Sequence, residues 1–584
     1  MPSPHGPGRA ARGRHARRAR VRRRRLLVTV VAAAVVAAVV VVVSAMSTPG
    51  TPPPGGARGG AASRTAHRGS GGTRPAGRSP GAGARTFHGP YGVESSAMVA
   101  ENRRPGTTAW KISGTPATGY VQGFAGRTYA SVGQKIPLYV STTGASFQVV
   151  AYRMGYYGGD GARAVWRSGQ VPGRVQPTCP LTPGVNMVSC DNWTASLTVE
   201  VTQAFVQGEY LLKLTGAAGQ QSYIPLTVWD PSSHAAYLVM TRSLTEEGWN
   251  TYGGYSYYQG QGPCTLGQTG SYPPCNRARV VSFDRPYSIG DGASDFLSNE
   301  YPLVRFMEQH GLDAAYCTDV TVDEHPTVLL DHRALLSLGH DETWTYPERA
   351  AAQTAMAHGV NLVFFGAAPL VRHSRLQPSS LGADREEVDY RSSAEDPLAA
   401  TGPTTTVTGN TFATPPVSDP VTTLVGTEYS GYLTTGVAPL PLVVHQPTAW
   451  IFKGTGLGAG ATVPAVIDSD INHVNPAAAP PDLEVLAHSP VPLSEAYTNQ
   501  GRWGADTYSD MTYYTDPTSG GGVFASGTVN WIFALNSCAP GGTTCTNAPL
   551  ATITGNLLSL FGQGAAGKSQ PSVANWQSVT PPGS

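Results

Sequence analysis

The chain has 584 residues, which is long enough for about three domains and for a large buried core. Its formal charge of +2 hides an asymmetry, because 16 of the 40 Lys and Arg residues lie before residue 86 and no acidic residue precedes Glu94. The rest of the chain holds 24 basic against 38 acidic residues. This acidic balance argues against nucleic acid as a partner.

The N-terminal 92 residues have the composition of a membrane signal followed by a linker. Ten arginines lie in residues 1–25, and residues 26–46 form an apolar stretch of membrane-spanning length. Arginines on that side keep the N-terminus in the cytoplasm, so the bulk of the chain is expected outside it, at the cell membrane. The alternative is a secreted protein, cleaved after Ala45. Residues 47–92 are rich in Pro, Gly and Arg and predict a disordered linker.

The cysteines agree with export. Six of the seven form near pairs in Pro- and Gly-rich loops, which predicts short-range disulfides. The seventh, Cys317, lies in an apolar run and is expected to be free and buried, and no spacing suggests structural zinc. The predicted bonds are Cys179–Cys190, Cys264–Cys275 and Cys538–Cys545.

Between the linker and residue 564, the pattern of apolar and polar residues changes once, at about residue 231. Residues 93–231 alternate apolar and polar positions in short runs, which predicts an antiparallel β-sandwich, either a carbohydrate-binding module or a packing domain. Residues 232–564 alternate strand and helix patterns, which predicts an α/β domain with an insertion at about 370–500. Residues 521–535 read as the last core strand and final helix, and residues 565–584 as a disordered tail.

One stretch of the α/β domain reads as a strand, a helix and a second strand. Residues 334–338 and 361–365 are apolar runs of strand length. Between them, Thr345 and Glu348 form a capping box, and Gly359 ends the Ala-rich helix. Such a unit implies parallel strands.

Three ionisable residues, His340, Asp341 and Glu342, follow the first of these strands. Ligands bind at the carboxyl edge of open α/β sheets, although loop solvation or a helix-dipole contact would also explain such residues. No G-x-S-x-G turn or phosphate-binding glycine loop occurs in a strand-to-helix context. The edge therefore predicts acid/base chemistry or a hard metal ion held by oxygen ligands, ferric iron included.

Several long motifs resemble the large (beta) subunit of N,N-dimethylformamidase and its relatives, over roughly residues 98–560. They stand in the same order along the chain. The motifs are WKISGTPATGYVQGFAGRTYASVGQKIPLYVST, FQVVAYRMGYYGGDGAR, VSFDRPY, NEYPLVRFMEQHGLDAAYCTD, LLSLGHDETW, GVNLVFFGA and VFASGTVNW.

The resemblance implies an α+β multidomain protein, in which a β-sandwich precedes an α/β domain like class I glutamine amidotransferases, a flavodoxin-like fold. It also implies a mononuclear ferric ion (Fe3+) held by two tyrosines and a glutamate, which hydrolyses a formamide to formate and an amine. Glu342 matches the glutamate, and His340 beside it becomes the acid/base residue. Tyr258 and Tyr223 best match the tyrosines, although each has aromatic packing as an alternative. Three further tyrosines crowd the loop before Tyr258: Tyr252, Tyr255 and Tyr257.

The chain departs from the family in several respects. Thr343 stands where relatives carry an aromatic residue, and Trp249-Asn250 replaces a Tyr-Asn pair. The membrane segment and the linker are not features of that family, and no small partner subunit is evident. We therefore expect a membrane-attached, extracytoplasmic hydrolase of a small amide. The alternative is a non-catalytic cell-surface binding protein with the same fold, and a homo-oligomer is left open.

Overall fold

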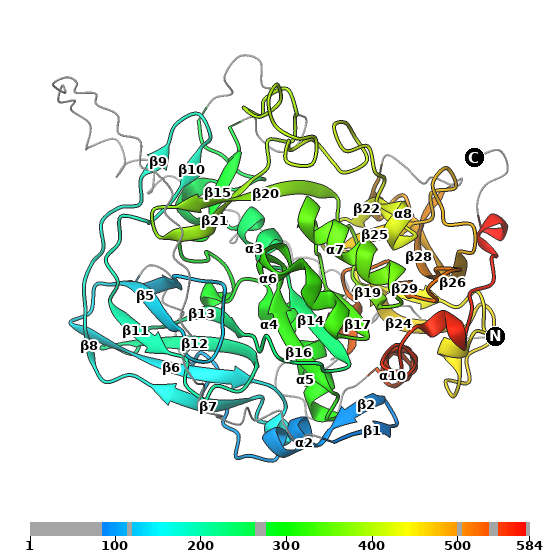
Figure 1. The fold of residues 1–584 in the computed structure, drawn as a ribbon, viewed down its shortest axis with the longest axis horizontal. Helices are drawn as coiled ribbons and strands as arrows, with labels where there is room; N and C mark the ends of the chain where they lie inside the picture. Colours follow the sequence, from blue (N-terminus) through cyan, green and yellow to red (C-terminus); the bar gives the residue numbers. More distant parts are fainter. Residues whose placement is uncertain (1–84, 114–119, 263–275, 499–504, 536–546, 580–584) are drawn as a thin grey trace, which may run out of the picture. The chain divides into compact units, whose positions relative to one another are not determined.

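A computed structural model describes residues 85–113, 120–262, 276–498, 505–535 and 547–579 (Figure 1). These residues form a mixed α+β structure with several sheets. Within these ranges no helix is both long and apolar enough to cross a membrane. The predicted membrane span at 26–46 and the cysteine pairs at 264/275 and 538/545 lie outside the described residues.

The first part of the described chain forms two sheets, here called the N-terminal sheet pair, which are antiparallel except that β4 pairs parallel to β13. One has the order β11-β5-β3, and the other has the order β4-β13-β12-β6-β7 with β8 paired to β6. Apolar side chains of both, such as Leu138 and Val149, share one buried core. The strands are β3 (Val121–Ala125), β4 (Tyr129–Ala130), β5 (Lys135–Thr142), β6 (Ser146–Met154), β7 (Ala162–Arg167), β8 (Val171–Pro172), β11 (Leu197–Glu200), β12 (Gly208–Gly216) and β13 (Gln221–Val228).

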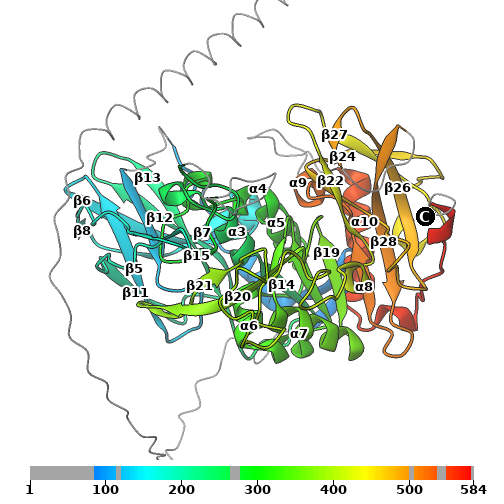
Figure 2. The same cartoon turned by 90° about the horizontal axis from the view of Figure 1, so that it is seen from above.

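A seven-stranded central sheet lies beside this pair in both views (Figures 1 and 2). Its order is β16-β14-β17-β19-β29-β28-β26, and the first five strands run parallel. The strands are β14 (Tyr237–Thr241), β16 (Ala314–Thr318), β17 (Ala334–Leu338), β19 (Asn361–Phe365), β26 (Glu484–Pro492), β28 (Asp506–Thr515) and β29 (Gly522–Ala525). Strand β26 lies inside the predicted insertion, so the end of that insertion extends the main sheet with an antiparallel strand.

Helices cover both faces of the central sheet because its buried strands are apolar on both sides. In β14, Tyr237 and Val239 point into one core, and Leu238 and Met240 point into the other. The first core receives α5 (Tyr301–Gln309), α9 (Trp531–Leu535) and α10 (Ala548–Phe561); the second receives α6 (Asp319–Glu324) and α7 (Tyr346–Ala357). The predicted capping box is confirmed, since the Thr345 side chain accepts a hydrogen bond from the Glu348 N–H.

Two ends of the described chain differ from the sequence-based expectation. The predicted linker runs to residue 92, but residues 86–95 form a hairpin of β1 (Thr86–Gly89) and β2 (Gly92–Ser95). This hairpin packs on α10. The final helix is α10 rather than α9, and residues 565–579 are not a loose tail. Asn575 exchanges two hydrogen bonds with the main chain of Val485 in β26. Both ends are held because they satisfy polar groups of the central layer.

The remaining strands form small sheets outside the central sheet. Their orders are β15-β21-β20-β18, β25-β22-β27 and β23-β24, with a separate β9/β10 hairpin. They are β9 (Leu181–Thr182), β10 (Met187–Val188), β15 (Val280–Ser282), β18 (Thr343–Thr345), β20 (Arg372–Ser379), β21 (Gly382–Val388), β22 (Glu428–Leu433), β23 (Leu440–Val443), β24 (Thr462–Ile467), β25 (Asp470–His473) and β27 (Ala496–Tyr497).

One predicted disulfide falls within the described residues and is confirmed. Cys179 and Cys190 are bonded, with 4.4 Å between their Cα atoms. Cys317 is free and fully buried, also as predicted. The bond closes a loop of the N-terminal sheet pair.

Candidate active site

The candidate site lies at the carboxyl end of β17, beside the point where the strand order of the central sheet reverses between β14 and β17. Strand β17 ends in Gly339, which has a φ of 59°. A Cβ atom there would lie 3.1 Å from the main-chain oxygen of Asn299, so this turn requires glycine. The turn directs His340 and Glu342 to the edge of the sheet, as the sequence predicted.

Glu342 accepts hydrogen bonds from three side chains of the site. One carboxylate oxygen accepts a short hydrogen bond from the Tyr258 hydroxyl and a second bond, of 3.2 Å, from Nε of Arg372. The other oxygen accepts from the indole N–H of Trp249 at 3.1 Å. Burial alone would raise the pKa of Glu342, but the charges of His340 and Arg372 outweigh it and hold the pKa below its usual range. Glu342 is therefore a buried, ionised carboxylate.

His340 lies between two carboxylates. Its Nε2 is 3.1 Å from Oδ2 of Asp470, the first residue of β25, and 3.7 Å from Oε2 of Glu342. Its main-chain oxygen accepts from Nη1 of Arg242 at 2.9 Å. Burial raises the pKa of Asp470, while His340 opposes that rise. The His340–Asp470 pair can therefore exchange a proton.

The third member of the predicted cluster, Asp341, faces the interior instead. It is fully buried and accepts from the Ser337 hydroxyl at 2.7 Å. Burial is the main reason that its pKa rises to about 6. Asp341 therefore belongs to the support of the turn and not to the open side of the site.

Aromatic rings form one wall. The Trp249 ring stacks on the Tyr258 ring with 3.8 Å between centroids, and the guanidinium of Arg391 lies 4.2 Å from the Tyr258 centroid. Trp249 is 40% exposed, and its ring centroid lies 5.8 Å from that of His340. A flat solute arriving from solvent would meet this indole beside the imidazole.

The structure separates the tyrosines of the loop before Tyr258. The Tyr257 hydroxyl is buried and donates to the main-chain oxygen of Glu387, and the Tyr252 hydroxyl accepts from Gln122 in the N-terminal sheet pair. Only Tyr258 among these loop tyrosines has a described hydrogen bond to Glu342.

Tyr223, the other predicted ligand, has a different environment. It is 3% exposed in β13, and its hydroxyl donates to the main-chain oxygen of Trp110 at 2.7 Å. Its described contacts lie within the N-terminal sheet pair and with the loop at Gly292, and none is with Glu342 or Tyr258. The structure thus joins His340, Glu342 and Tyr258 but gives Tyr223 a packing role.

Sequence reasoning missed four side chains of the site and noticed a fifth without giving it a role. The four that were missed all stand in the predicted insertion: Arg372, Arg391, Tyr429 and Asp470. The pKa of Tyr429 is raised, first by burial and then by the nearby charges of Asp470 and Glu342. The replacement of the family's tyrosine by Trp249 was a usable signal for the fifth.

The family resemblance implies a ferric centre of three anionic oxygens that face one point. Tyr258 bonds to Glu342, and the partly buried phenol of Tyr429 stands near both. Beside them stands the indole of Trp249, which offers an N–H and no lone pair to a metal. Arg372 adds positive charge next to Glu342, and burial raises the pKa of Tyr258, which favours the neutral phenol.

Within the described residues, no group of three or more His, Cys, Asp or Glu side chains could hold a metal ion. The predicted ligand set of Tyr223, Tyr258 and Glu342 does not meet at one point, because the Tyr223 hydroxyl bonds to Trp110 instead. Whether the chain binds iron stays a prediction.

One comparison with known proteins identifies a relationship. Residues 148–547, more than half of the chain, match the model of the family described as N,N-dimethylformamidase beta subunit-like, C-terminal. The match includes Trp249, Tyr258, His340, Glu342 and Asp470. No curated protein shows significant similarity to the chain.

Proposed function

Because the chain belongs to the N,N-dimethylformamidase beta subunit-like family, we propose that it hydrolyses the C–N bond of a small amide. The observation that carries this proposal is the convergence of His340, Asp470 and Glu342 beside an exposed indole. These residues lie at the sheet edge where α/β proteins bind ligands.

The architecture supports the finer fold assignment that the resemblance implies. Numbered along the chain, the five parallel strands have the order 2-1-3-4-5, which is the order of flavodoxin-like sheets. The shared core of the N-terminal sheet pair supports a β-sandwich. We propose both assignments.

The proton route follows from the positions of His340 and Asp470. In the proposed reaction this pair takes a proton from the attacking water as its oxygen bonds to the amide carbon. The pair then returns the proton to the nitrogen as the C–N bond breaks, which yields a carboxylic acid and a free amine. The ionised carboxylate of Glu342, 3.7 Å from the imidazole, stabilises the protonated form of His340 during this exchange.

Tyr258, Arg372 and Trp249 position the carboxylate of Glu342 in this proposal. Their three hydrogen bonds reach both of its oxygens and keep it charged. Iron is not included in the proposed proton route, because Tyr223, the second predicted ligand, has no described contact with Glu342.

We also propose that the catalytic part lies outside the cytoplasm, attached through residues 26–46. The arginine asymmetry and the Cys179–Cys190 bond support this location. Protease added to spheroplasts should remove the folded part and leave a short membrane fragment. A cytoplasmic protein treated in parallel should stay intact, and full protection of both would refute the location.

The activity is tested with the purified full-length chain and a panel of formamide, N-methylformamide, N,N-dimethylformamide and acetamide. Release of equal amounts of amine and carboxylate is expected for at least one of them. Binding of an amide without turnover would instead support the non-catalytic surface protein. The metal content of the same preparation shows whether any turnover follows bound iron.

A further inference from the structure

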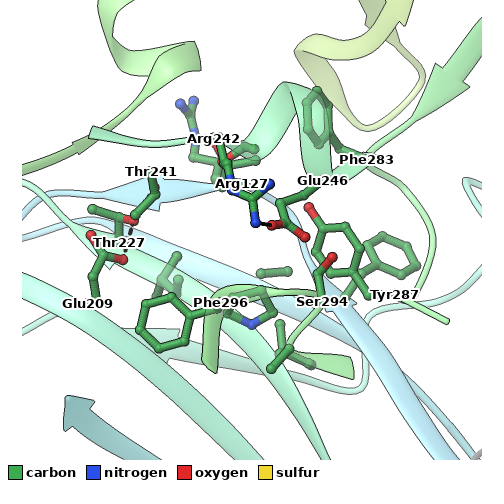
Figure 3. Close-up of a pocket in the computed structure, with 18 of the residues that line it drawn as sticks. Arg127, Glu209, Thr227, Thr241, Arg242, Glu246, Phe283, Tyr287, Ser294 and Phe296 are labelled. Atoms are coloured by element: carbon green, nitrogen blue, oxygen red, sulfur yellow. Dashed lines mark hydrogen bonds and ion pairs between the residues drawn. The ribbon is translucent and has the colours of Figure 1, made fainter. Parts of the chain in front are cut away.

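A second cavity, separate from the site around Glu342, lies between the N-terminal sheet pair and the carboxyl end of β14 (Figure 3). Its volume is about 70 Å3. Phe283, Tyr287 and Phe296 line it with aromatic surface. Three glutamates, Glu209, Glu246 and Glu300, contribute to its lining. The cavity thus combines apolar walls with buried acids.

The acids outnumber the guanidinium that pairs with them. Arg242 is 2% exposed, and it lies 2.8 Å from Glu246 through Nη2 and 3.2 Å from Glu300 through Nε. A single buried positive charge therefore serves two buried carboxylates. Burial is the main cause that raises the pKa of Glu246 to about 8 and that of Glu300 to about 7. Without a bound cation, Glu246 is therefore mostly protonated at neutral pH, and a bound cation would favour its ionised form.

The other arginines of the lining do not correct this imbalance. Arg285 is bonded to Glu247 and to main-chain oxygens, and Arg385 is bonded to Asp284 in the same way. Arg127 is exposed, so water screens its charge.

Glu209 supplies an independent sign of a missing partner. This residue of β12 is 4% exposed, and one carboxylate oxygen accepts from the Thr227 hydroxyl at 2.7 Å. The other oxygen, Oε1, is buried and has no hydrogen-bond partner among the described residues. An unpaired buried polar atom is costly, and here it belongs to a residue that lines a cavity.

The size and lining favour an organic cation over a metal ion. A volume of about 70 Å3 corresponds to about five waters at roughly 10–15 Å3 each. A divalent metal would require a tight shell of about six oxygens, whereas this lining mixes aromatic and aliphatic side chains with its charged groups. Aromatic faces attract ammonium ions, and a carboxylate accepts their N–H bonds.

We propose that this cavity binds a small organic ammonium ion, held by Glu209 and Glu246 and enclosed by the aromatic walls. Dimethylammonium has the charge, the two N–H donors and the small size that the cavity suits. The binding inference stands without the proposed hydrolysis, because it rests on the cavity alone.

If the proposed hydrolysis holds, the same cavity can report the amine product to the active site. Glu246 and Trp249 stand on the same short helix, α3 (Ser243–Trp249), and Trp249 donates to Glu342. Arg242, which pairs with Glu246, also holds the main-chain oxygen of His340. A cation that draws Glu246 away from Arg242 would therefore affect both contacts.

Binding is tested by calorimetric titration of the full-length chain with dimethylammonium chloride, against sodium chloride at the same ionic strength. Saturable binding is expected only for dimethylammonium, and acetone, a neutral molecule of similar size, should not compete. Burial raises the pKa of Glu209, and the cation would bind its ionised form, so Glu209→Gln should weaken the affinity at least tenfold because glutamine cannot ionise. The matched control is Glu200→Gln, at an exposed position at the end of β11, which should bind as the parent does.

A second variant, Ala293→Leu, fills the cavity without changing its charge and should also weaken binding at least tenfold. Thermal unfolding shows whether each variant is folded. The proposal is overturned if the parent gives no saturable signal, which would mean a cavity filled by water only. Equal affinity in the parent, Glu209→Gln and Ala293→Leu would overturn it too. Neither result depends on whether the chain hydrolyses amides.

Discussion

Replacement of His340 by asparagine should lower kcat/KM for amide hydrolysis by about 10²–10⁴-fold, the usual contribution of a positioned acid/base group. The imidazole is the only group described within ion-pair distance of both Asp470 and Glu342, so its loss breaks the proton route at its centre. Asparagine keeps a polar side chain but cannot carry the proton. Most of the loss should appear in kcat, because substrate is held by other groups.

The matched control is His358→Asn. This exposed histidine caps α7, and within the described residues its ring has one hydrogen bond, between Nδ1 and the main-chain oxygen of Thr354, so activity should be unchanged. Asp470→Asn should also reduce activity, and the double variant with His340→Asn should lose little more than His340→Asn alone, since the two residues act as one unit. Independent, multiplicative losses would contradict the proposed proton pair.

Much of the central layer could be predicted from local sequence. The apolar runs at 237–241, 334–338 and 361–365 have the length and the residues of buried strands. The capping box at Thr345 sets the start of α7 through contacts only three residues apart. Helix α10 was missed, although its buried residues Leu550, Ile553, Leu557 and Phe561 follow helical spacing.

The site could be predicted only in part, for a physical reason. His340 and Glu342 follow a recognisable strand, so their place at the sheet edge is a local property. Asp470 reaches them from 130 positions further along the chain, because β25 folds back over the edge. The local sequence pattern does not predict this long-range contact. The sequence also does not show which of Tyr257 and Tyr258 contacts Glu342. The Tyr257 hydroxyl donates to the main chain of β21, and the Tyr258 hydroxyl donates to Glu342.

Replacement of Trp249 by tyrosine should raise the amount of ferric iron that the chain retains. The indole N–H of Trp249 donates to Glu342, and the indole ring stacks on Tyr258. A tyrosine at position 249 would therefore bring a second phenol oxygen close to the Glu342 carboxylate and the Tyr258 hydroxyl. Two phenolates and one carboxylate are hard anionic ligands that suit ferric iron, and the metal supplies the driving force to remove the phenol protons.

The measurement is iron content after loading and desalting, together with a visible absorption scan. Trp249→Tyr should retain stoichiometric iron and show a tyrosinate-to-iron charge-transfer band, whereas the parent should show neither. Trp249→Phe is the matched control, because it removes the indole N–H equally but adds no oxygen. A band of equal strength in the parent would mean that Glu342 and Tyr258 hold iron with some other third ligand, and the metal-free proton route would then be wrong. Removal of the band by Glu342→Gln in the Trp249→Tyr background would place the new iron at this carboxylate and nowhere else.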